Sequence, residues 1–95
     1  MADISIVQEH GLNPDMARAA AQTVADKMAA DYGLALKWDG DVLRFERGGV
    51  NGALTLEAQR AVMRIELGFP MGMMASAIES KVAEKMRKVF GAQAA

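Results

Sequence analysis

Hydrophobic residues recur at every second position through the middle of this sequence, and short turn motifs interrupt the pattern. The alternating positions are Leu34, Leu36 and Trp38, then Leu43 and Phe45, then Val50, Leu54 and Leu56, and finally Ala61, Met63, Ile65 and Leu67. A period of two is typical of strands that bury one face. Asp39-Gly40 and Gly48-Gly49 are suited to tight reversals, and we expect a third turn near residues 58–60. The segment therefore predicts four consecutive antiparallel strands.

A strand and a helix are predicted before this segment. Residues 3–7 alternate between isoleucine and polar side chains, which indicates a short strand. Asn13 is a suitable N-cap, Pro14 suits the first helical position and Gly33 ends a helix that runs to about Tyr32. The expected inward stripe of this helix is Ala17, Ala20, Ala21, Val24 and Met28, with Tyr32 as a further candidate at its end.

A second helix is predicted from about Gly72 to Phe90, where apolar residues recur at helical spacing. Its expected stripe is Met74, Ile78, Val82 and Met86, with Val89 or Phe90 next. Residues 91–95 are expected to fray. The element order β-α-β-β-β-β-α predicts an α+β fold in one domain spanning residues 1–95, with one antiparallel sheet and two helices packed on one face. The second face should be solvated, because it carries Lys37, Arg44, Glu46, Glu57, Arg64 and Glu66.

Composition narrows the functional classes. With 95 residues, 52% of them hydrophobic, the chain can build one core. A formal net charge of −1 argues against nucleic-acid binding, which usually needs a basic excess. There is no cysteine, no signal-peptide pattern, and no apolar run of about 20 residues that could span a bilayer. We therefore expect a cytoplasmic protein.

Several short motifs follow one another along the chain. They are a strand ending in His10-Gly11-Leu12, Ala17-Arg18, Trp38-Asp39-Gly40-Asp41, Phe45 to Leu54 with Arg47, Gly49, Val50 and Gly52, Leu67-Gly68-Phe69, and Ile78-Glu79. In this order they resemble the polyhydroxyalkanoic acid system proteins, also called the polyhydroxyalkanoate granule region family, over nearly the whole chain. The family is encoded near polyester storage genes in bacteria and has no established activity. The resemblance therefore implies a cellular setting at storage granules and not a reaction.

Residues 67–78 form the most unusual segment, with twelve uncharged residues that include three methionines. In one interpretation Phe69 and Met74 anchor the second helix in the core. In the other, Met71 and Met73 stay exposed near Phe69 and form an apolar surface for a partner protein, a second copy or a polyester granule. Both can hold, because the helix has one inward stripe. The candidate interaction surface is Phe69, Met71, Met73 and Met74, and the basic end of the helix would favour acidic partners.

An alternative function is the binding of a small acyl or hydroxyacyl ligand. The candidate pocket lies between helices and sheet, near Trp38, Phe45 and Phe69. Packing of these rings against one another would exclude it. A homodimer through a sheet edge is also compatible with the sequence, since an open sheet leaves an edge strand.

No set of residues is placed for catalysis. His10 is the one histidine, and no nucleophile or orienting partner accompanies it in the sequence. A local hydrogen bond in a loop explains it better. Asp39 and Asp41 lack the other ligands of a calcium loop, and Gly48-Gly49 joins two strands and does not open a helix. We expect a non-enzymatic protein with no catalytic, metal or cofactor site.

Overall fold

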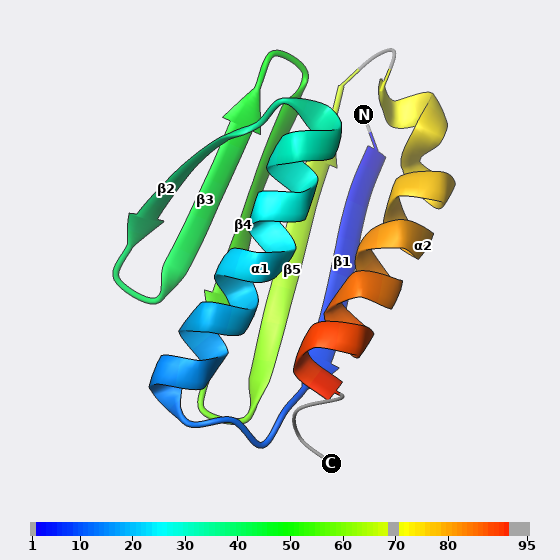
Figure 1. The fold of residues 1–95 in the computed structure, drawn as a ribbon. Coiled ribbons are helices and arrows are strands. Elements are labelled where there is room, and N and C mark those ends of the chain that lie inside the picture. Colours follow the sequence, from blue (N-terminus) through cyan, green and yellow to red (C-terminus); the bar gives the residue numbers. More distant parts are fainter. Residues whose placement is uncertain (1, 69–70, 92–95) are drawn as a thin grey trace.

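The structure is a computed structural model that describes residues 2–68 and 71–91. It contains one antiparallel sheet of five strands and two helices, as the sequence predicts (Figure 1). In chain order the elements are β1 (Ala2–Glu9), α1 (Pro14–Tyr32), β2 (Ala35–Asp39), β3 (Val42–Arg47), β4 (Val50–Leu56), β5 (Arg60–Leu67), a 3₁₀ turn η1 (Met71–Met74), α2 (Ala75–Met86) and a final turn η2 (Arg87–Gly91).

The order of strands in the sheet is β1-β5-β4-β3-β2, so the first strand pairs with the last. Strands β2 to β5 form the expected meander. Strand β1 adds to its far side in register, with Ile4 opposite Ile65 and Ile6 opposite Met63. Strands β1 and β2 are consequently the two edges of the sheet.

Both helices lie on the same face of the sheet, with α1 over β3 and β4 and α2 along β1 (Figure 1). The predicted stripe of α1 is buried from Ala17 to Met28 and half-buried at Tyr32. The strands beneath bury Leu43, Phe45, Leu54, Met63 and Ile65. Asn13 caps α1, because its side chain accepts a hydrogen bond of 2.8 Å from the backbone N–H of Met16. Gly33 follows α1 in the left-handed conformation, with φ of 68°.

Gly52 leaves room for an aromatic ring inside the covered layer. It pairs with Phe45 across β3 and β4. A Cβ atom at Gly52 would lie 2.9 Å from the backbone oxygen of Arg64 and would collide with the Phe45 ring. The absent side chain therefore lets Phe45 lie against the strand, where it is 2% exposed.

The start of the second helix differs from the prediction. Ile78, Val82, Met86 and Phe90 are buried as expected, but Met74 is 52% exposed. Met74 closes the 3₁₀ turn η1, and α2 begins one residue later. A 3₁₀ turn has three residues per turn, so it rotates the side chain of Met74 away from a stripe that follows the α-helical period. The placement of Met74 on the inward stripe was wrong.

Candidate interaction surfaces

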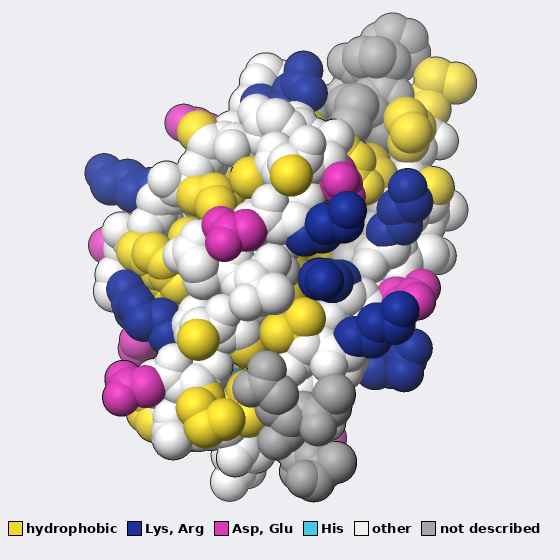
Figure 2. All heavy atoms as spheres, in the orientation of Figure 1, with side chains coloured by type: hydrophobic (Ala, Val, Ile, Leu, Met, Phe, Trp, Pro, Cys, Tyr) yellow, Lys and Arg dark blue, Asp and Glu magenta, His cyan; other side chains and the backbone are white. Residues whose placement is uncertain are grey.

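The apolar surface predicted from residues 67–78 lies where the chain enters α2. Met73 is 80% exposed and Met74 is 52% exposed. Phe69 lies outside the described residues, and of Met71 the structure describes the backbone in η1 alone. The turn is fixed to the end of β5, because the backbone N–H of Gly72 donates a hydrogen bond of 2.9 Å to the oxygen of Gly68. Figure 2 shows hydrophobic side chains protruding at this end of the molecule.

A groove of about 580 Å³ runs between α1 and α2. Met28 and Val82 form its apolar floor, and Lys27, Lys81, Lys85 and Lys88 line it. Figure 2 shows several Lys and Arg side chains over this junction. Lys27 pairs with Asp31 at 3.3 Å and Lys88 with Glu84 at 3.0 Å. The groove therefore combines a small apolar floor with an excess of positive charge.

The pKa values of two groups in this groove are shifted by their surroundings. The hydrogen bond from Lys88 lowers the pKa of the Glu84 carboxyl, and the positive charge of Lys88 adds to the effect. Burial raises the pKa of the Tyr32 phenol, and the charge of Asp31 raises it further. Glu84 is therefore held ionised and Tyr32 is held neutral.

Trp38 and Phe45, two of the three residues of the candidate ligand pocket, have different environments. The indole N–H of Trp38 donates to Gln22 Oε1 at 2.8 Å, and the Arg18 guanidinium lies 3.9 Å from the ring centroid. Phe45 is buried over Gly52. The third residue, Phe69, lies outside the described residues. The groove between α1 and α2 is lined by other residues than these.

His10 is buried, which the sequence did not indicate. It is 6% exposed, and its Nδ1 atom accepts a hydrogen bond of 3.2 Å from the backbone N–H of Leu12. Its ring stacks on Phe90 with 5.5 Å between centroids. Phe90 is eighty residues away in the sequence, so local pattern could not reveal this contact. The local hydrogen bond itself agrees with the prediction.

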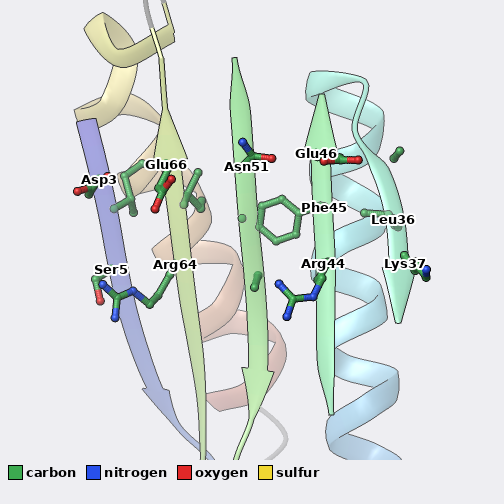
Figure 3. A pocket seen from close by; sticks show the side chains of 15 residues that line it. Asp3, Ser5, Leu36, Lys37, Arg44, Phe45, Glu46, Asn51, Arg64 and Glu66 are labelled. Atoms are coloured by element: carbon green, nitrogen blue, oxygen red, sulfur yellow. The ribbon is translucent and has the colours of Figure 1, made fainter. Parts of the chain in front are cut away.

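The face of the sheet without helices carries long charged side chains around a shallow depression of about 760 Å³ (Figure 3). Its lining includes Gly52 and Ala53 of β4 and the ring of Phe45 from the candidate ligand pocket (Figure 3). The charged side chains in the lining include Arg44, Glu46, Arg64 and Glu66. Arg44 lies 3.6 Å from Asp39. Sequence alternation predicts which residues share this face, but their arrangement across the strands depends on the strand register.

The described residues also bear on metal binding and on membrane insertion. Within residues 2–68 and 71–91 there is no group of three or more His, Cys, Asp or Glu residues that could hold a metal ion. In the same ranges no helix is long and apolar enough to cross a membrane.

Comparison with known proteins places the chain in a family. The model of the family described as "putative polyhydroxyalkanoic acid system protein" matches residues 4–90, which includes every strand and both helices in whole or in large part. A search of curated proteins finds no match. The resemblance seen in the sequence motifs is confirmed: this chain belongs to the polyhydroxyalkanoic acid system protein family.

Proposed function

We propose that this protein is a non-enzymatic accessory protein of polyhydroxyalkanoate storage that associates with granules through the surface formed by Phe69, Met71, Met73 and Met74. The observation that carries the proposal is the exposure of two adjacent large apolar side chains, Met73 at 80% and Met74 at 52%. Burying one such side chain is worth about 1.5–3 kcal/mol. Contact with an apolar polymer surface or a granule protein would recover this free energy.

The properties of methionine and of α2 support the same proposal. Methionine side chains are unbranched and polarizable, so they adapt to a surface that has no fixed shape. The exposed side of α2 and η2 carries Lys81, Lys85, Arg87 and Lys88. These cations would favour acidic groups at the granule surface or on its proteins. Under the proposal the protein works in the cytoplasm, at storage granules.

Fractionation of polymer-producing cells tests this function. The wild-type protein should sediment with the granules, and the Met73→Glu, Met74→Glu double variant should move to the soluble fraction. The matched control is Met16→Glu, because Met16 is also exposed but lies at the start of α1, near the opposite end of the molecule (Figure 1). Wild-type protein found entirely in the soluble fraction would contradict the proposal, and so would equal redistribution of Met16→Glu.

A second candidate function is the binding of a small acyl or hydroxyacyl ligand through its carboxylate. The groove between α1 and α2 favours it, since an apolar floor of Met28 and Val82 lies beside Lys81 and Lys85. The carboxylate would pair with the lysines and the carbon chain would cover the floor. Calorimetric titration with 3-hydroxybutyrate and with dodecanoate tests this candidate. Binding by the wild type that is lost in the double variant Lys81→Glu, Lys85→Glu would support this function. The absence of any heat of binding with either compound would exclude it.

A further inference from the structure

The exposed side chains of the open face are ordered in rows that run across all five strands. The strand register places Asp3, Glu66, Asn51, Glu46 and Ala35 side by side, which we call the acidic row. The next row along the strands is Ser5, Arg64, Ala53, Arg44 and Lys37, the basic row. Figure 3 shows the labelled members of the two rows at two successive levels of the sheet. Three acids therefore lie parallel to three bases.

Two further rows flank the charged ones. Beyond the basic row lie Val7, Val62, Thr55, Val42 and Asp39, of which three are valines; this is the apolar row. Two residues beyond Glu66, Asn51, Glu46 and Ala35, past the ends of the paired strands, lie Gly68, Gly49, Gly48 and Gly33, which we call the glycine row. The hydrogen bond of 2.8 Å from Gly68 N–H to the oxygen of Gly49 fits this arrangement. Among the described residues, one end of the face therefore consists of glycines, and the other end is mostly apolar.

The charges of the two central rows are not paired with each other inside the chain. Among the described residues, the acidic and basic rows form no ion pair with one another, and Arg44 instead lies 3.6 Å from Asp39 in the apolar row. Neighbours on one face of a strand are two residues apart, or about 6.8 Å. Glu66 and Arg64, and likewise Glu46 and Arg44, are therefore available to a partner.

We propose that the open face binds the open face of a second copy of this chain, around a two-fold axis that runs between the acidic and basic rows. Rotation about this axis turns the second sheet over and exchanges the two rows. Each residue keeps its position along the direction of the rows. Strand β5 of one copy therefore lies over β5 of the other, and β3 lies over β3. Glu66 then faces Arg64 of the second copy, Glu46 faces Arg44, and the reciprocal pairs form as well.

The same axis also matches the outer rows by size. It places the apolar row of one copy over the glycine row of the other. Gly48 and Gly49 have open space around them, since a Cβ atom at either position would meet nothing within 4 Å. Under this axis Val42 lies over Gly48 and Val62 lies over Gly68, so both valines rest on backbone where side chains would otherwise obstruct them. Stacked sheets pack with their strands nearly aligned, and this arrangement meets that requirement.

The size of the face predicts a weak dimer. Five strands about 4.8 Å apart and about seven residues long give roughly 570 Å² per copy, or roughly 1,100 Å² in total, at the low end of specific interfaces. Four ion pairs at a partly solvated interface contribute more to specificity than to affinity. We therefore expect a dimer whose dissociation constant rises steeply with ionic strength.

Charge exchange between the rows is the decisive experiment. One variant carries Glu46→Arg and Glu66→Arg, a second carries Arg44→Glu and Arg64→Glu, and a third carries all four substitutions. Every site is exposed, so circular dichroism should show folded proteins. Sedimentation velocity over about 1 μM to 1 mM protein in about 20 mM salt measures the dimer. The four-site variant keeps the formal net charge of −1, which separates row matching from overall charge.

The wild type and the variants should differ in how strongly they dimerise. The wild type should dimerise and dissociate in about 500 mM salt. Each two-site variant should have a dissociation constant raised about 100-fold or more. Their equimolar mixture and the four-site variant should both return to within about tenfold of the wild type. Gly48→Leu should also weaken the dimer, because its side chain would meet the apolar row of the second copy.

Three results would overturn the proposal. The first is a wild type that stays monomeric at low salt over the whole concentration range. The second is that both two-site variants dimerise as strongly as the wild type does. That result would indicate a different dimer, formed by pairing of the β1 edge strands. The third is a four-site variant that stays as weak as its two-site parents. If one variant failed to fold, the salt dependence and Gly48→Leu would still decide the matter.

Discussion

The two faces of the sheet are built from the same five strands, yet the side chains on one face are mostly buried and those on the other are mostly exposed to solvent. On the covered face, Met63 and Ile65 are buried under the helices. On the open face, Val62 is half-buried, and Arg64 and Glu66 are in water. Because the faces alternate residue by residue, neighbouring positions of one strand have opposite roles. The covered face fixes the fold, and the open face is free to carry recognition.

The largest difference between the faces should appear when an acid is placed on each. Ile65→Asp would bury an unpaired carboxylate at a position that is 1% exposed. Such a group costs several kcal/mol, which is a large part of the about 5–15 kcal/mol that stabilises a typical domain. We expect loss of the cooperative thermal transition. The control is Arg64→Asp, one residue away on the open face, which should melt as the wild type does in about 500 mM salt, where the proposed dimer is dissociated.

Gly52→Ala tests how tightly the covered layer is packed. The new Cβ atom would lie 2.9 Å from the oxygen of Arg64 and would displace the buried Phe45 ring. Overpacking of this kind costs about 1–3 kcal/mol, measured as a lower free energy of unfolding in urea. Gly48→Ala is the control, because open space surrounds it and its φ is not positive. Equal stability of the two variants would show that the Phe45 ring is not confined.

The same substitution at two asparagines compares the covering layer with the open face. Asn13→Ala removes the cap of α1 and should lower the free energy of unfolding by about 1 kcal/mol. Asn51→Ala removes an exposed amide from the acidic row (Figure 3) and should change it by less than about 0.5 kcal/mol. A larger loss in Asn51→Ala would mean that the open face contributes to the stability of the fold.

The smallest effect is expected for the one ion pair between the basic and apolar rows. Arg44 and Asp39 lie 3.6 Å apart with side chains 60% and 69% exposed. Pairs of this kind contribute little, so Asp39→Asn should change the free energy of unfolding by less than about 0.5 kcal/mol. Chemical denaturation in low and high salt measures this. A loss above about 1 kcal/mol that disappears in high salt would contradict the solvated character of the face.

The strands, both helices and the side of the sheet that the helices cover could be predicted from sequence, because each depends on local periodicity and end signals. The caps at Asn13 and Gly33 belong to the same category. The pairing of β1 with β5 depends on contacts far apart in the sequence, and it adds Asp3, Ser5 and Val7 to the rows of the open face. The other members of each row are aligned by the registers between β2, β3, β4 and β5. Periodicity assigns Arg64 and Glu66 to one face, but it cannot align them with Arg44 and Glu46.

Two side chains show where local pattern fails. Met74 keeps the spacing of the helical stripe, but the 3₁₀ turn before α2 changes its direction and exposes it. His10 follows a strand like any polar loop residue, but Phe90 from the far end of the chain covers it. The cause is a local change of helix type for Met74 and a tertiary contact for His10. The predicted interaction surface was therefore identified from its composition, while the orientation of its side chains required the structure.

Binding of the purified protein to washed polyhydroxyalkanoate granules is the most direct test of the proposed function, because it removes other cellular partners. The granules should be pelleted with the wild type, with Met73→Glu, Met74→Glu and with Met16→Glu in parallel. We expect the wild type and Met16→Glu to pellet together with the granules and the double variant to stay in the supernatant. Equal pelleting of all three folded proteins, or of none, would contradict association through the exposed methionines.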